Sequence, residues 1–501
     1  MGPIRDHILI VLATLCAAAA GASAQTAETA PATQPAATAP QPPQLSGPQR
    51  LPWSEVSPDL QEHMASLLAD ANWPIRVFAI LRLERYSGPE PQRMIRQAVA
   101  DKDWQVRCFA LRAAARMNIA IEPVALSDET DPKVLRTALR EGIALPADQI
   151  KPHAMRLLKT RGIEELVLGL ELAVCCDIDE VRQEAEKRAV RLIKNMDDSV
   201  ALLISRRLAL VVGLARPHEN AREWRAWLAS KGDTLTLATA DSMRQSFSRA
   251  ATPLISGMDD DAFTRLLDYL SSLKQRDLDL VIVMDATASM IPMVNQARAG
   301  VDSLILFMGD ISKQMRLAFV AYRDHDNEPV WDGHPFTTDI TSIRKYLFEL
   351  RITGGADLPE AVLEGLTATG KLGWNPKAER EVVLVGDAPP HDQDMYQVRE
   401  LLSSMRNGGV TVHAVHVPME YPPGMYERMP PPEAEERRQF LENYNASTAR
   451  TFQEIAETGG GEMTELKGAE ALVPAIMHFT IEEGWWSAFD EFYTVYLEMC
   501  R

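Results

Sequence analysis

The strongest constraint on the fold is a set of short apolar runs in the second half of the sequence. They lie at residues 278–285, 316–324, 380–387 and 410–417. Amphipathic stretches with helical periodicity separate them, for example residues 293–311. Apolar runs that alternate with helices predict a parallel sheet whose two faces are both covered. We therefore expect an α/β domain with a mostly parallel central sheet.

Three of these runs end in an aspartate, namely Asp285, Asp324 and Asp387. In open α/β sheets ligands bind at the carboxyl ends of the strands, so these carboxylates lie where a site is expected. Thr287 and Ser289 follow Asp285 at alternate positions, which turns their hydroxyl oxygens toward a common point. Carboxylate and hydroxyl oxygens, without imidazole or thiolate, suit a hard cation such as Mg²⁺, Mn²⁺ or Ca²⁺.

The same loop has a purely structural interpretation. Asp285, Thr287 and Ser289 are residue types that cap helices, and a helix is expected to begin near Ile291. An enzyme of the haloacid-dehalogenase type would need a second aspartate two residues after the first, where this chain has Thr287. Motifs of nucleophile elbows, phosphate-binding loops and HExxH metalloproteases do not occur in the sequence. We therefore expect a binding protein and not an enzyme.

Other polar residues follow the same strands. Asp324 is expected to pair with Arg323 or with a loop amide. His391 and Asp392 come shortly after Asp387 and are close enough in sequence to reach the rim of a site. A single surface histidine is more often inert, so we assign His391 no role.

The segment Asp-Ala-Thr-Ala-Ser at residues 285–289 resembles the metal-ion-dependent adhesion site of von Willebrand factor A (vWA) domains, which reads Asp-x-Ser-x-Ser. The stretches YRDHD (322–326), GGADLPEAV (354–362) and GDAPPHD (386–392) are similar to a bacterial and protozoan branch of this family that includes kinase-linked proteins of the vwka type. Nothing in the chain resembles their kinase part. The resemblance implies a Rossmann-like vWA domain over residues 277–482.

The resemblance also implies a set of metal ligands: Asp285, Thr287, Ser289, Asp357 and Asp387. Mg²⁺ is the expected ion, with Mn²⁺ and Ca²⁺ as alternatives. In this family an acidic side chain of a protein partner completes the coordination, and Asp357 stands where a threonine is usual. An extra carboxylate makes the ion less attractive to an acidic partner. Asp357 is expected instead to raise metal affinity or to act through water.

The first half of the chain has helical periodicity and a weak internal sequence repeat, whose four copies are called echoes below. Residues 70–83 and 101–114 share an acidic residue, a tryptophan, an arginine and then an apolar helix, and weaker copies follow at 131–140 and 177–193. The spacing resembles HEAT-type helical repeats over residues 51–235, with an irregular helical bundle as the alternative. The arginines of the four echoes are expected to tie one turn to the next: Arg76, Arg107, Arg136 and Arg182. A helical connector is expected over residues 236–276.

The N-terminal end predicts export. Residues 1–24 have a polar head, an apolar stretch and small residues before Gln25, which is typical of a cleaved signal peptide. Residues 25–50 are rich in Pro, Ala, Thr and Gln and predict a disordered linker. The protein is therefore expected in the periplasm or outside the cell. A net charge of −18 argues against nucleic acid as a partner, and no later run is long enough for an integral membrane segment.

The C-terminal end, residues 483–501, predicts an amphipathic helix. Its aromatic residues recur at steps of three and four, which gathers them on one stripe: Trp485, Phe489, Phe492, Tyr493 and Tyr496. Acidic side chains on the other face argue against a membrane surface. The stripe is expected either to dock on the α/β domain or its junction with the repeats, or to form a self-association or partner face. We expect the two modules to fold separately.

These observations favour an exported protein that binds a protein partner through a divalent cation on its vWA domain, with the repeats as a second docking surface. The alternatives are a structural scaffold whose metal only stabilises the domain and, less favoured, a metal-dependent hydrolase.

Overall fold

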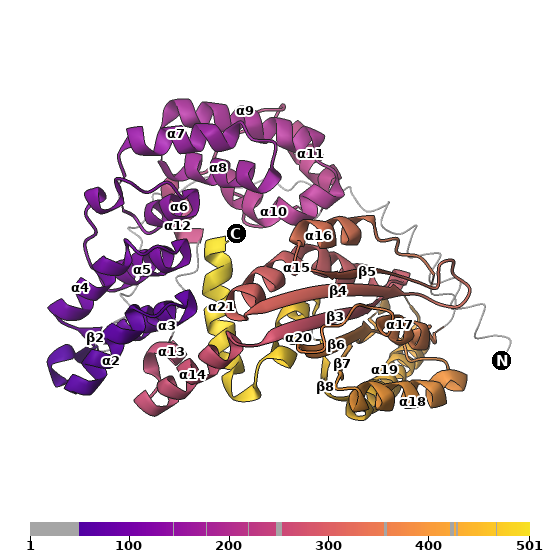
Figure 1. Ribbon diagram of the computed structural model, residues 1–501. Coiled ribbons are helices and arrows are strands. Elements are labelled where there is room, and N and C mark those ends of the chain that lie inside the picture. Colours follow the sequence, from indigo (N-terminus) through magenta and orange to yellow (C-terminus); the bar gives the residue numbers. More distant parts are fainter. Residues whose placement is uncertain are drawn as a thin grey trace. The chain divides into compact units, whose positions relative to one another are not determined.

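The computed structural model describes residues 50–500, apart from 144, 177, 219, 247–252, 355–357, 421–424, 427–428 and 467 (Figure 1). The expected signal peptide at 1–24, nearly all of the expected linker at 25–50, and Asp357 lie outside the described residues. Among the residues that are described, no helix is both long and apolar enough to cross a membrane.

The first half of the described chain is almost entirely helical. Its helices are α2 (Pro58–Leu68), α3 (Trp73–Leu83), α4 (Pro89–Ala98), α5 (Trp104–Arg116), α6 (Pro132–Arg140), α7 (Ala147–Leu158), α8 (Ile163–Cys176), α9 (Asp179–Asn195), α10 (Asp198–Val212), α11 (Ala221–Ser230) and α12 (Ala240–Ser246). Two short strands, β1 (Leu51–Pro52) and β2 (Tyr86–Ser87), pair in parallel. Local signals start several helices: Ser57 and Asp131 accept hydrogen bonds from the first-turn N–H groups of α2 and α6, and Pro58 and Pro132 follow them. The helical region fits a repeat architecture.

Two of the four echoed arginines, Arg76 and Arg107, tie one turn to the next as the sequence predicts, whereas Arg136 and Arg182 have other buried or backbone partners. Arg76 is buried and makes a bidentate ion pair with Asp101, with 2.8 Å from each of two guanidinium nitrogens to a carboxylate oxygen. Asp101 lies in the acidic turn of the next echo. Arg107 repeats the arrangement with Glu129, at 2.6 and 3.1 Å. The first two echoes are therefore joined by arginine–carboxylate pairs between successive turns. Arg136 pairs with Glu171, and Arg182 donates to the backbone carbonyls of Leu237 and Ala238.

Helices α13 (Pro253–Gly257) and α14 (Asp260–Leu273) lead into a six-stranded sheet with the order β5-β4-β3-β6-β7-β8. The strands are β3 (Asp277–Asp285), β4 (Gln314–Tyr322), β5 (Trp331–Thr337), β6 (Glu379–Gly386), β7 (Thr411–His416) and β8 (Gly460–Glu465). All neighbours are parallel except β4 and β5. The expected mostly parallel sheet is therefore confirmed, with one antiparallel edge strand.

Side chains of β3 alternate between two apolar layers. Leu280, Ile282 and Met284 belong to the same buried cluster as α15 (Ile291–Ile311), α16 (Ile340–Glu349) and α20 (Leu472–Thr480). Val281 and Val283 belong to a second cluster with α17 (Val362–Thr369), α18 (Met395–Asn407) and α19 (Pro431–Gly459). Both faces of the sheet are covered by helices, which is why the strands are apolar on both sides.

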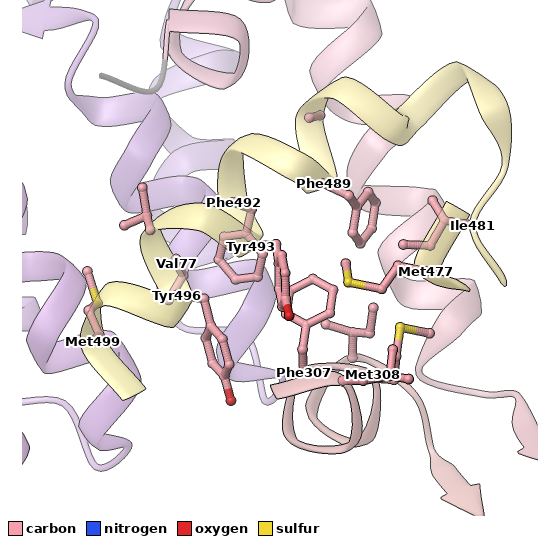
Figure 2. Packing of buried hydrophobic residues seen from close by; sticks show 14 of the residues in the cluster. Val77, Phe307, Met308, Met477, Ile481, Phe489, Phe492, Tyr493, Tyr496 and Met499 are labelled. Atoms are coloured by element: carbon pink, nitrogen blue, oxygen red, sulfur yellow. The ribbon is translucent and has the colours of Figure 1, made fainter. Parts of the chain in front are cut away.

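The C-terminal helix α21 (Trp486–Cys500) joins the helical region to the α/β domain (Figure 2). Phe492 stacks on Phe109 with ring centroids 5.4 Å apart and lies 4.8 Å from Phe78, both of which belong to the helical region. Phe307 of α15 contacts Tyr493 edge-on at 5.0 Å. The aromatic stripe is thus buried at the junction, which is one of the two locations the sequence left open.

This packing corrects the expectation that the two modules are separate units. A single cluster of buried apolar residues runs from the helical region through α21 to the sheet, and residues from Arg50 onward form one compact unit. Polar contacts add to it, since Arg112 of α5 pairs with Glu498 of α21 at 3.0 Å. Apart from the aromatic stripe of residues 483–501, the sequence pattern of each module is complete by itself, so it gives no sign that the modules share a core.

Candidate metal centre

The candidate centre lies where β3 and β6 end side by side. Asp285 is the last residue of β3, and Asp387 follows the last residue of β6. Met284 is in register with Val385, so the two aspartates project from adjacent strand ends. Gly386, between them, leaves room for the Tyr322 hydroxyl, because a Cβ atom there would lie 2.6 Å from it.

Hydrogen bonds gather the loop after β3 around the Asp285 carboxylate. Its Oδ1 accepts one bond from the Thr287 backbone N–H at 2.7 Å and one from the Thr287 hydroxyl at 2.6 Å. The hydroxyls of Thr287 and Ser289 are 3.3 Å apart. Asp285 and Thr287 are buried, whereas Ser289 is exposed. The structure therefore brings together Asp285, Thr287, Ser289 and Asp387, with only the serine open to solvent.

Helix capping does not account for this arrangement. The residue that precedes α15 is Met290, and no side chain caps the helix there. Thr287 precedes the short 3₁₀ turn Ala288–Met290, and its side chain makes no capping bond either. The hydroxyls and the carboxylate face each other and not the helix terminus.

The electrostatics of the two aspartates favour a cation. Burial raises the pKa of Asp285 well above its ordinary value, and the neighbouring Asp387 raises it further. Burial also raises the pKa of Asp387, against an opposing hydrogen bond from Ser289. The second Asp285 oxygen, Oδ2, is buried and has no hydrogen-bond partner among the residues described. Two buried carboxylates, one with an unused oxygen, and two hydroxyls form a donor set that fits a hard divalent cation.

Three further polar residues, which the sequence did not predict, surround the centre. Burial raises the pKa of Tyr322, and the carboxylates of Asp285, Glu360 and Asp387 add to this rise. Glu360 is buried, and its backbone N–H donates to the Pro389 carbonyl at 3.0 Å. Burial, then Asp387, raises the pKa of Tyr444, whose hydroxyl donates to the Leu358 carbonyl at 3.3 Å. Glu360 lies in the same sequence segment as Asp357, and this proximity is the signal from which the sequence could have predicted it.

The neighbouring residues differ in part from expectation. Arg323 pairs with Asp332 at 2.9 Å and not with Asp324. Asp324 accepts from the His325 backbone N–H at 2.6 Å, which is the loop-amide alternative. His391 is not isolated: its Nε2 lies 3.0 Å from Asp324 Oδ1, and its ring stacks on that of His325. These partners are distant in the sequence, so the pattern around His391 did not indicate them.

Comparison with known proteins identifies the domain. A family model described as the von Willebrand factor A domain matches residues 279–468. An α-protein kinase, vwkA, of Dictyostelium discoideum is 26% identical over 126 residues, which are 25% of this chain and 20% of that protein. An ariadne-like RING finger protein of Acanthamoeba polyphaga mimivirus is 28% identical over 117 residues, 23% of this chain and 12% of that protein. The chain thus spans a fifth or less of the length of these relatives.

Solved structures with a similar domain include an aerotolerance-related membrane protein from Bacteroides fragilis, at 15% identity and a TM-score of 0.28, covering 40% of this chain and 98% of that one. The SpRpn10 VWA domain is 12% identical, with a TM-score of 0.29, and covers 40% of this chain and 95% of that one. Residues 279–468 form a vWA domain that follows a mostly helical region. A vWA domain supports a role in protein interaction or adhesion.

Proposed function

We propose that the chain is an exported protein that binds a protein partner through a divalent cation on its vWA domain. The observation that carries this proposal is the buried Asp285 and Asp387 pair, whose unused oxygen and raised pKa values call for a positive charge beside them. Nearby hydroxyls of Thr287 and Ser289 complete an oxygen-only donor set. Mg²⁺ is the ion we expect, with Mn²⁺ and Ca²⁺ as alternatives.

Each residue has a distinct role in this proposal. Asp285 and Asp387 supply charge, directly or through water, while Thr287 and Ser289 supply neutral oxygens. When bound, the ion offers an open coordination position to an oxygen ligand of the partner. Ser289 is the exposed member of the set, so the open position is expected on its side. Asp357 remains a proposed fifth ligand from the segment after α16.

A structural scaffold with a stabilising metal is the second candidate. It is favoured by one observation, namely that Asp285, Thr287 and Asp387 are all at most 3% exposed. A buried ion would stabilise the loop without meeting a partner. The two candidates differ in whether a partner's binding depends on the metal. Catalysis is the least favoured function, because the described residues of the centre include no nucleophile paired with a general base.

Calorimetric titration with Mg²⁺ and Mn²⁺ tests the metal site. We expect one ion to bind the wild-type protein and none to bind Asp285→Ala, which should keep its fold because the change removes one of two buried carboxylates at the end of β3 and leaves the apolar side chains of the strand in place. Asp392→Ala is the matched control, since Asp392 is an exposed carboxylate five residues after Asp387. Undiminished binding by Asp285→Ala would exclude this assignment.

Partner binding is tested by capture from an envelope extract. We expect a protein that is retained with Mg²⁺, released by EDTA and not retained by Asp285→Ala. Retention that survives EDTA while the metal still raises the melting temperature would favour the scaffold.

Export is tested separately: mass spectrometry of the secreted or periplasmic protein should find a mature chain that begins at Gln25. An intact Met1 in that fraction would contradict signal cleavage.

A further inference from the structure

A second group of side chains of metal-ligating types lies at the same carboxyl edge of the sheet. Asp324 comes two residues after the end of β4, and His391 comes five residues after the end of β6. Atoms of Asp324, His325 and His391 that can bind a metal all lie within 4.8 Å of one another. None of these three side chains belongs to the set around Asp285. They differ from that set in chemistry, because two of them are imidazoles.

The carboxylate at the centre of this group is buried and already oriented. Asp324 is 4% exposed. Its Oδ1 accepts from the His325 backbone N–H at 2.6 Å and lies 3.0 Å from His391 Nε2. The two histidine side chains are more open, at 37% for His325 and 17% for His391. A buried carboxylate below two solvent-accessible imidazoles is an arrangement that an ion can reach from outside.

We propose that Asp324, His325 and His391 bind a second divalent ion of the zinc class. Imidazole and carboxylate together suit Zn²⁺, Co²⁺ or Ni²⁺, whereas oxygen-only sets suit Mg²⁺. The spacing fits: two ligand atoms that are each about 2.0–2.1 Å from a tetrahedral zinc ion lie roughly 3.3 Å apart. The observed 3.0 Å between His391 Nε2 and Asp324 Oδ1 therefore needs only a small adjustment.

One side chain has to turn for the ion to bind. A metal lies in the plane of the imidazole that binds it, but the rings of His325 and His391 are stacked, with planes 10° apart and centroids 4.7 Å apart. His325 is the more exposed ring, so it is the one that rotates. Its Nε2 is 2.9 Å from Glu364 Oε1, and atoms of His325, Glu364 and Asp394 again lie within 4.8 Å of one another. Glu364 is thus within reach as a fourth ligand.

Titration with Zn²⁺ and Co²⁺ alone, on the full chain, tests this site. Binding is followed by competition with a chromophoric chelator and by the visible absorption of bound Co²⁺. We expect one ion on the wild-type protein, and a loss of affinity of roughly 100-fold or more in His391→Gln, because losing a direct ligand costs at least as much as losing an outer-shell contact. His325→Gln should behave alike. His153→Gln, in α7, is the control and should bind as the wild type does.

The Asp285→Ala variant separates the two sites. It should lose Mg²⁺ yet keep the Co²⁺ absorption. Melting temperatures without metal show whether His391→Gln remains folded. If it does not, the titration relies on His325→Gln, in which the substituted side chain is more exposed. The proposal is overturned if the wild type binds no Zn²⁺ or if both histidine variants bind it undiminished. It is also overturned if Asp285→Ala abolishes Co²⁺ binding while both histidine variants retain it. In this last result the ion would occupy the Asp285 centre, which leaves the function proposed above intact.

Discussion

At the residue scale, the centre combines buried charge with one exposed hydroxyl. Burial first, and then the neighbouring Asp387, disfavour the charged form of Asp285, and a cation beside the two carboxylates would offset both effects. Ser289 lies at the solvent side of the pair. In the function we propose, the two aspartates determine whether an ion binds, and the serine lies where a partner would meet it.

Replacing Ser289 with alanine tests its role as a ligand. The side chain is exposed, so Ser289→Ala leaves no cavity and should change the stability of the metal-free protein by less than about 0.5 kcal/mol. Mg²⁺ affinity should fall roughly 10- to 100-fold because one oxygen ligand is lost. Melting temperatures with and without Mg²⁺ measure both effects. An unchanged shift on adding Mg²⁺ would mean that Ser289 does not contact the ion.

A second residue-scale prediction concerns a buried ion pair in the helical region. Burial by itself would raise the pKa of Glu171, but Arg207 and Arg136 outweigh it and lower the pKa to about 2. Arg136 is fully buried and lies 2.6 Å from the Glu171 carboxylate, and Arg207 lies 2.8 Å from it. A depressed pKa stabilises the folded state at neutral pH. That stabilisation is lost as the pH falls from about 4.5 toward about 2.

Glu171→Gln should therefore lower stability at pH 7 by about 3–5 kcal/mol, because it leaves a buried arginine without its charge partner. The difference between wild type and variant should shrink as the pH falls through this window. Urea midpoints of both proteins at pH 7, 5, 4 and 3 measure it. A difference that stays constant down to pH 3 would show that Glu171 is not held ionised by its arginines.

At the scale of elements, the first echoes of the helical region are joined by Arg76 and Arg107, which pair with Asp101 and Glu129 between successive turns. Arg76 is 3% exposed, whereas its partners Asp101 and Asp103 are 15% and 36% exposed. Solvent therefore screens part of the interaction. The bidentate geometry with Asp101 and the additional bond from Arg76 to the Asp70 carbonyl at 2.7 Å still connect three segments.

Arg76→Met should lower stability by about 2 kcal/mol, since it removes these bonds and leaves partly buried acceptors unpaired. The matched control is Arg93→Met. Arg93 is exposed, and its ion pair with Glu90 lies within one helix, so we expect no measurable change there. Thermal melts of both variants measure the two effects. Equal losses of melting temperature would mean that Arg76 contributes no more to stability than an exposed arginine does.

At the scale of the whole molecule, α21 buries its aromatic rings between the helical region and α15 (Figure 2). A shared core makes the two parts unfold together, because opening either one exposes apolar surface of the other. We expect one calorimetric transition for residues 50–500. Two separate transitions would restore the view that the modules are independent.

Phe492 is the sharpest probe of this shared core. It is fully buried and contacts Phe78, Phe109 and Phe307. Phe492→Ala should cost about 3–5 kcal/mol and lower the melting temperature. Phe440→Ala is the control, because Phe440 is 41% exposed, and it should change little. Deleting residues 484–501 should likewise yield a less stable monomer that binds a hydrophobic dye. An equally stable monomer would mean that α21 serves a partner.

The sequence by itself determined the features that depend on local pattern. Alternating apolar runs and helices predict the sheet, because buried parallel strands need apolar residues on both faces. The spacing of Asp285, Thr287 and Ser289 brings their oxygens together within a single loop. The acidic turn and arginine of each echo likewise predict the Arg76 and Arg107 pairs.

Only the tertiary structure decided which distant segments meet. Asp324 and His391 are 67 residues apart, and they come together because β4 and β6 both flank β3. The aromatic stripe of α21 shows that something must cover it, but not what. Apolar burial is non-directional, so the same stripe suits a partner, a second copy or the junction. The stripe lies at the junction because its rings pack against complementary apolar side chains of α3, α5 and α15 there.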